Sequence, residues 1–109
     1  MSFLKKPATW REAADESEFD ASDRKMVDFG GEKQVGLFKV DGEFFAISAW
    51  CSHQKTSMVH GDIEGHELMC PLHGARFDLR SGKNLSLPAV RPVDSYDVKV
   101  EDGKIYIKI

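Results

Sequence analysis

The chain has 109 residues and a formal net charge of −3, and 30% of its residues are charged. This length is typical of a single domain, here residues 1–109, and allows a modest hydrophobic core without help from metal or disulfides. The charge balance, with no Lys/Arg-rich run, argues against nucleic-acid binding. No apolar run approaches the roughly 20 residues that span a bilayer, and MSFLKKPATW lacks the apolar part of a secretory signal. We therefore expect a soluble, cytoplasmic protein.

The N-terminal segment carries a signal for a helix. Thr9 and Glu12 have the spacing of a capping box, in which the first and fourth residues satisfy each other's backbone amides. We expect one short helix that starts near Thr9, with Trp10, Ala13 and Ala14 facing inward.

From Lys25 onward the chain reads as short β-type runs broken by turn residues. Asp41-Gly42 separates KQVGLFKV from EFFAIS, and Asp102-Gly103 separates YDVKV from KIYIKI. Asp-Gly is typical of two-residue hairpin turns. Residues 50–92, between these hairpins, are rich in turn residues and contain all four histidines. The pattern predicts an all-β fold, an antiparallel sandwich or small barrel with loops projecting from it.

Both cysteines lie in this loop-rich region, and each is followed closely by a histidine. The first pair is Cys51-x-His53, the second is Cys70-x-x-His73, and 16 residues lie between the pairs. In a reducing cytosol, such cysteines are more often metal-binding or catalytic than joined in a disulfide. One tetrahedral zinc ion would accept all four ligands. A [2Fe–2S] cluster with two Cys on one iron and two His on the other is the alternative.

The order of the ligands favours the iron–sulfur cluster, because each loop supplies one Cys and one His and so reaches both irons. These two motifs, with CPLHGARFDLRSGK around the second, resemble the Rieske family. The resemblance continues in GEFFAISAWCSH and LPAVRPVDSYDVKVEDGKIYIKI, and covers the chain from about Lys33. It implies a fold of the Rieske type and one [2Fe–2S] cluster, bound by Cys51, His53, Cys70 and His73.

The resemblance also implies a low reduction potential. High-potential members have two further cysteines that form a disulfide, and the matching positions here are Thr56 and Leu72. Those members also have a serine and a tyrosine that donate hydrogen bonds to the cluster sulfurs, and the matching positions here are Ala75 and Phe77. Because such donors stabilise the reduced cluster, we expect a potential near the lower end of the family range of about −150 to +300 mV.

Four other residues of this region have less specific interpretations. We expect Gly74 to allow a close approach of the backbone to the cluster. Pro88 resembles the proline of a loop that covers the cluster in this family, but an ordinary turn explains it equally well. His60 and His66 lie in the spacer between the motifs, where glycines indicate exposed turns, so we interpret both as solvated loop residues.

Taken as a whole, the resemblance implies a ferredoxin similar to those of aromatic-ring dioxygenase systems. It would be a monomeric electron carrier and not an enzyme, with a flavin-dependent reductase as donor and a terminal oxygenase or similar enzyme as acceptor. Two other functions stay open: a zinc-stabilised binding module, and the small subunit of a larger reductase such as assimilatory nitrite reductase. A thiol enzyme is disfavoured, since no separate base is evident.

Overall fold

The computed structural model describes residues 9–31, 33–51, 57–71, 74–87 and 91–109. Within these ranges the chain forms ten β-strands and one short 3₁₀ helix, and all paired strands run antiparallel. The all-β, antiparallel fold predicted from the sequence is confirmed. Across the described residues, no helix has the length and apolar character needed to cross a bilayer.

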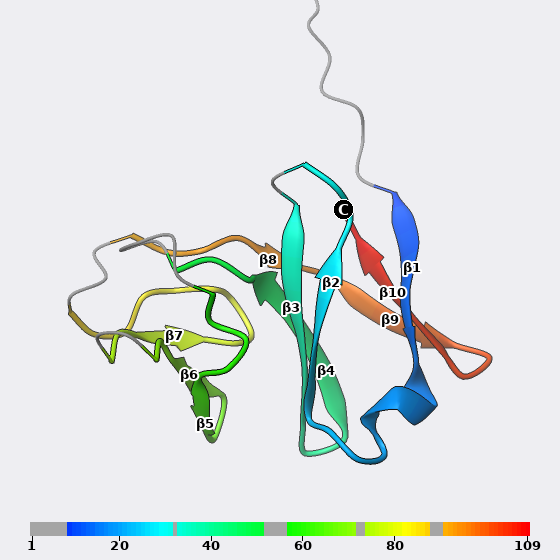
Figure 1. Ribbon diagram of the computed structural model, residues 1–109, viewed down its shortest axis with the longest axis horizontal. Helices are drawn as coiled ribbons and strands as arrows, with labels where there is room; N and C mark the ends of the chain where they lie inside the picture. Colours follow the sequence, from blue (N-terminus) through cyan, green and yellow to red (C-terminus); the bar gives the residue numbers. More distant parts are fainter. Residues whose placement is uncertain (1–8, 32, 52–56, 72–73, 88–90) are drawn as a thin grey trace, which may run out of the picture.

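The strands form three sheets (Figure 1). The first has the order β1 (Trp10–Asp15), β10 (Lys104–Lys108) and β9 (Val98–Glu101). The central sheet has the order β2 (Arg24–Asp28), β3 (Gln34–Val40), β4 (Glu43–Ser48) and β8 (Ser95–Tyr96). The third has the order β5 (Asp62–Glu64), β6 (Glu67–Met69) and β7 (Arg76–Asp78).

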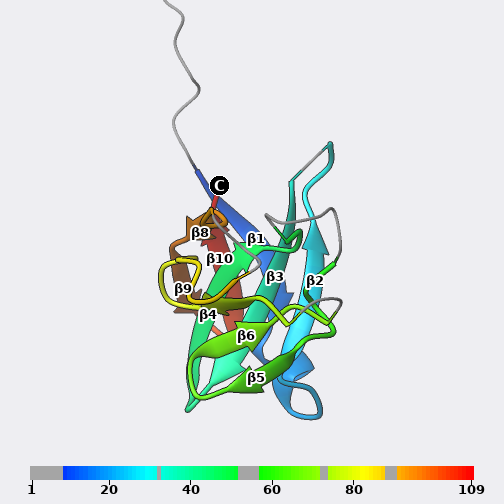
Figure 2. The same cartoon turned by 90° about the vertical axis from the view of Figure 1, so that its left-hand side faces the viewer.

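The central sheet separates two hydrophobic cores. Successive side chains of a strand point to opposite faces, so Leu37 and Ala46 pack toward the first sheet while Phe38 and Ile47 pack toward the third. Figure 1 shows the first and third sheets on opposite sides of the central one, and Figure 2 views the molecule from the side of the third sheet. The third sheet and its loops therefore form a separate layer on one face of the scaffold.

Both predicted hairpins are present. β3 and β4 are joined by Asp41 and Gly42, with φ angles of 51° and 80°, and β9 and β10 by Asp102 and Gly103, with φ angles of 51° and 77°. Two successive residues with positive φ are the requirement of a type I′ turn, which Asp-Gly meets at low cost.

The predicted helix near Thr9 is wrong. Residues Trp10–Asp15 form strand β1, which pairs with β10, and a 3₁₀ helix follows at Glu16–Phe19. Ala14 is buried as expected, but Trp10 is exposed. A short isolated helix is marginal in water, whereas pairing with β10 gives the backbone of this segment hydrogen-bond partners along one edge. The side chain that reaches back to an amide is Glu18, whose Oε2 accepts from the Asp15 N–H at 2.7 Å.

Candidate metal centre

Cys51 is the first residue inside a loop whose two ends are joined by backbone hydrogen bonds. The chain leaves β4 through Ala49, whose carbonyl accepts from the Met58 N–H at 2.7 Å, and Trp50 forms an antiparallel bridge with Ser57. These contacts fix where the loop leaves and rejoins the scaffold. His53 and Thr56 belong to residues 52–56, outside the described part of the chain.

Cys70 is likewise the first residue of its loop, which connects β6 and β7. Its N–H donates to the Ala75 carbonyl at 2.6 Å, and its carbonyl accepts from the Gly74 N–H at 3.0 Å. Gly74 has a φ of 74°, a left-handed conformation that glycine adopts without strain. His73 and Leu72 lie outside the described residues, as does Pro88.

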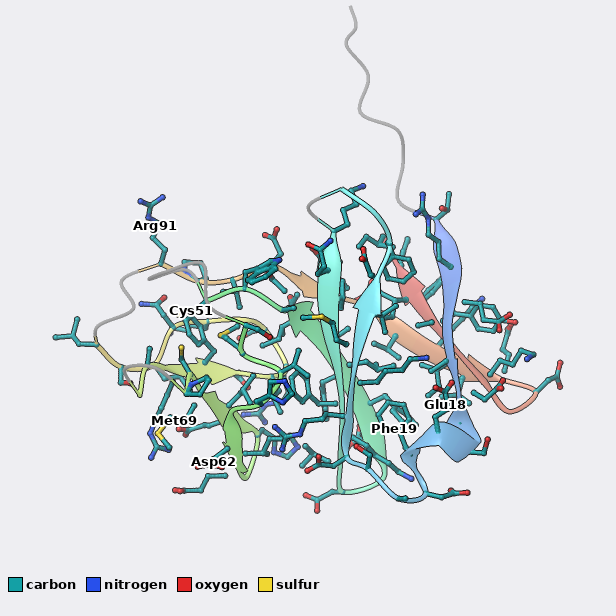
Figure 3. All side chains as sticks on the ribbon, viewed as in Figure 1. Glu18, Phe19, Cys51, Asp62, Met69 and Arg91 are labelled. Atoms are coloured by element: carbon teal, nitrogen blue, oxygen red, sulfur yellow. The ribbon has the colours of Figure 1, made fainter. Side chains whose placement is uncertain are left out.

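The two cysteines share one hydrophobic core, although they come from different loops. Cys51 is 5% exposed and Cys70 is 3% exposed, and they are not joined in a disulfide. Figure 3 places Cys51 on the same side of the central sheet as Met69, the neighbour of Cys70. The buried members of this core are Phe38, Ile47, Cys51, Met58, Leu68, Cys70, Ala75, Phe77, Leu79 and Val93.

The core that contains the two thiols is apolar in the described part of the chain. Among the described residues no polar or charged side chain is buried, and Ala75 and Phe77 are both 0% exposed. Neither side chain can donate a hydrogen bond. The charged groups of this layer lie on its rim, where Arg76 forms ion pairs with Glu64 at 3.7 Å and with Glu67 at 3.4 Å.

This arrangement fits a thiolate-bound metal group. Two buried thiols, on separate loops whose ends are hydrogen-bonded, can approach one metal centre. Both iron–sulfur clusters and zinc take cysteine thiolates as ligands. Within the described ranges, no group of three or more His, Cys, Asp or Glu side chains is arranged so that it could hold a metal ion. The two described cysteines thus account for half of the predicted ligand set.

The spacer histidines differ from each other. His60 is exposed, as expected for a solvated loop residue. His66 is half-buried, with its ring edge-on to Phe45 at 5.4 Å between centroids, so for His66 that interpretation is wrong. Gly61 is also buried, and a Cβ there would lie 2.0 Å from the Met69 carbonyl oxygen. Close packing, and not an exposed turn, explains this glycine.

Two interactions near the site were not anticipated from the sequence. The Trp50 indole Nε1 donates to Gln34 Oε1 at 3.0 Å, which fixes an exposed aromatic ring beside Cys51. Arg24 of β2 donates from Nη1 to the carbonyls of Val59 and Gly61. The position of Trp50 directly before Cys51 is a sequence signal that could have identified it, whereas nothing in the sequence connects Arg24 with a segment 35 residues later.

Comparison with known proteins agrees with this fold. The model of the Rieske [2Fe-2S] domain matches residues 9–97. A 3-phenylpropionate/cinnamic acid dioxygenase ferredoxin subunit of Photorhabdus laumondii is 49% identical over 76 residues, which are 69% of this chain and 72% of that protein.

Solved structures show the same similarity. The ferredoxin of carbazole 1,9a-dioxygenase from Nocardioides aromaticivorans IC177 aligns with a TM-score of 0.84 and 31% identity, over 92% of this chain and 97% of that one. A complex of reduced oxygenase and oxidized ferredoxin in carbazole 1,9a-dioxygenase contains a chain with the same TM-score and 25% identity, aligned over 91% of this chain and 92% of that one. The chain therefore belongs to the Rieske [2Fe-2S] domain family, which implies one Rieske-type [2Fe–2S] cluster.

Proposed function

We propose that this protein is a soluble, cytoplasmic one-electron carrier, a ferredoxin that is not itself an enzyme. Residues 1–109 act as one domain and one monomer, and the cluster is held by Cys51, His53, Cys70 and His73. The observation that carries the proposal is the burial of both cysteines in one apolar core, each at the start of a loop with hydrogen-bonded ends.

The chain's own residues supply the conditions that such a cluster needs. The cluster, when bound, takes up and releases a single electron. Met58, Leu68 and Phe77 are fully buried in the same core as the cysteines and keep water from that side. Because Ala75 and Phe77 offer no hydroxyl, the reduced form gains no side-chain hydrogen bond from them, which supports a potential near the lower end of the family range.

The names of the relatives support the direction of electron flow. The similar chains include a dioxygenase ferredoxin subunit and a ferredoxin in complex with its oxygenase. We infer a terminal oxygenase or similar enzyme as acceptor and a flavin-dependent reductase as donor. Transient redox complexes bury small interfaces, below about 1,200 Å² in total. Three exposed apolar side chains suit such a contact: Trp50, which adjoins Cys51, and Leu85 and Leu87, which follow β7 in the chain.

Metal analysis combined with spectroscopy tests the function. Purified protein, prepared without oxygen, should contain two irons and two sulfides per chain and show a rhombic EPR signal only after reduction with dithionite. One zinc per chain, no sulfide and no colour would overturn the proposal in favour of a zinc-stabilised module. Co-purification of a large flavin or haem subunit would favour a reductase subunit.

The histidines provide a matched test of the ligand set. His53→Asn and His73→Asn should each abolish the EPR signal, since asparagine cannot replace imidazole as an iron ligand in such a site. His60→Asn is the control, because His60 is exposed and outside the motifs. A normal signal in either ligand variant would contradict the assignment.

A further inference from the structure

The guanidinium of Arg24 links the central sheet to the layer that contains the cysteines. Its Nη1 donates to the Val59 carbonyl at 2.8 Å and also to the Gly61 carbonyl. Both acceptors lie more than 30 residues away in the sequence, in the segment between the two cysteine loops. The Arg24 side chain is 23% exposed, so these hydrogen bonds are largely shielded from water.

The segment that Arg24 holds touches both cysteine loops. On one side, the Met58 N–H donates to the Ala49 carbonyl, two residues before Cys51. On the other side, Gly61 packs so closely against the Met69 carbonyl, directly before Cys70, that a Cβ would not fit. A further hydrogen bond, from the Gly61 N–H to the Met58 carbonyl at 2.9 Å, closes the turn between these two contacts. A displacement of this turn would therefore change the positions of both loops.

Arg24 is itself held in a fixed orientation. Asp23 accepts from its Nε at 2.8 Å and from its Nη2 at 3.4 Å, and this interaction with Arg24 holds the pKa of Asp23 below its usual value. The guanidinium also lies over the ring of Phe38, 5.8 Å from the ring centroid. Such a combination needs the planar, five-donor group of arginine, and a lysine ammonium cannot reproduce it.

We propose that Arg24 is a positioning residue of the cluster site: by fastening the turn at Met58–Gly61 to β2, it sets the relative positions of the Cys51 and Cys70 loops. The inference rests on the proposed function, because the loops are taken to bind the cluster. Arg24 acts through the backbone of this turn and contacts neither cysteine.

The test compares three variants of the full-length protein purified with its cluster. Arg24→Met removes the charge and the donors, whereas Arg24→Lys keeps the charge but not the fork of donors. Arg80→Met is the matched control, because Arg80 follows β7 of the third sheet and has a 62% exposed side chain. Among the interactions described, it pairs only locally, with Asp78.

Two readouts are made on each variant: amide hydrogen exchange, and the rate at which an iron chelator removes the cluster. We expect roughly tenfold faster exchange at the amides of Met58, Gly61 and Cys70 in both Arg24 variants, with unchanged exchange in strands β1, β9 and β10. Chelation should accelerate by a similar factor. Arg80→Met should match the wild type in both readouts.

Three results would overturn the inference. The first is unchanged local exchange in Arg24→Met. The second is a uniform increase across all strands, which would make Arg24 a general stabiliser. The third is wild-type behaviour of Arg24→Lys, which would show that the fork of donors is not required. A wild-type protein without iron would instead disprove the proposed function, and the exchange experiment alone would then decide whether Arg24 fastens the turn.

Discussion

Two side chains in the core that contains the cysteines have a measurable consequence for the reduction potential. Ala75 and Phe77 lie in the core that contains both cysteines, and neither can donate a hydrogen bond. Introducing a donor at either position should stabilise the reduced, more negative form of the cluster. Ala75→Ser and Phe77→Tyr should therefore each raise the reduction potential, by about 60 mV if the new hydrogen bond is worth about 1.4 kcal/mol to the reduced form.

Potentiometric titration followed by EPR measures this shift. Ala46→Ser is the control, since Ala46 is equally buried but belongs to the core on the other face of the central sheet. Its potential should equal that of the wild type. Unchanged potentials in both donor variants would show that these positions do not face the cluster sulfurs.

At the scale of the elements, two glycines are required for different physical reasons, one for the conformation of a turn and the other for close packing. Gly42 has a φ of 80° and open space around it, so Gly42→Ala strains only the backbone. Gly61 lies where a Cβ would be 2.0 Å from the Met69 carbonyl, and no rotamer can relieve a clash of Cβ with backbone. We expect Gly42→Ala to lower the free energy of unfolding by about 1–2 kcal/mol and to keep its cluster.

Gly61→Ala should lower the free energy of unfolding by about 1–3 kcal/mol. It should also reduce the iron content, because the added Cβ pushes β6 and the Cys70 loop away from the turn at Met58–Gly61. Urea denaturation and iron analysis of the two variants, prepared in parallel, check both effects. Equal iron content in the two variants would show that the contact between Gly61 and Met69 does not position the second loop.

The elements that could be predicted from the sequence are those specified locally. The two Asp-Gly hairpins follow from the φ angles that their turns require, and each connects strands that are adjacent in the chain. Strand β1 pairs with β10, about 90 residues later, so its local capping signal pointed to a helix instead. Strands β5, β6 and β7 have three residues each, too few to show a period of two.

The same limit applies to the site. The spacing of Cys51 and Cys70 from their histidines is a local pattern, and the prediction that both cysteines belong to one site agrees with their shared core. The ligand roles of His53 and His73 stay predictions. The contact between Arg24 and the turn at Met58–Gly61 depends on how β2 sits against the third layer, which no local pattern encodes.

At the scale of the whole molecule, the three sheets enclose two separate hydrophobic cores, one on each face of the central sheet. One core joins the first sheet to the central sheet and contains Leu37, while the other joins the central sheet to the third sheet and contains Leu68. Both leucines are 0% exposed. They therefore form a matched pair, alike in chemistry and burial but different in the core that they fill.

Leu37→Ala and Leu68→Ala should each lower the free energy of unfolding by about 2–5 kcal/mol, the usual cost of a buried leucine. Only Leu68→Ala leaves a cavity in the core that holds the cysteines, where the added space loosens the packing and lets water approach the cluster. Because water stabilises the more negative reduced form, the potential of Leu68→Ala should rise, whereas that of Leu37→Ala should stay at the wild-type value. Urea denaturation gives the first quantity, and potentiometric titration of the folded proteins gives the second. Equal shifts of the potential in both variants would mean that the central sheet does not insulate the cluster from changes in the core on its other face.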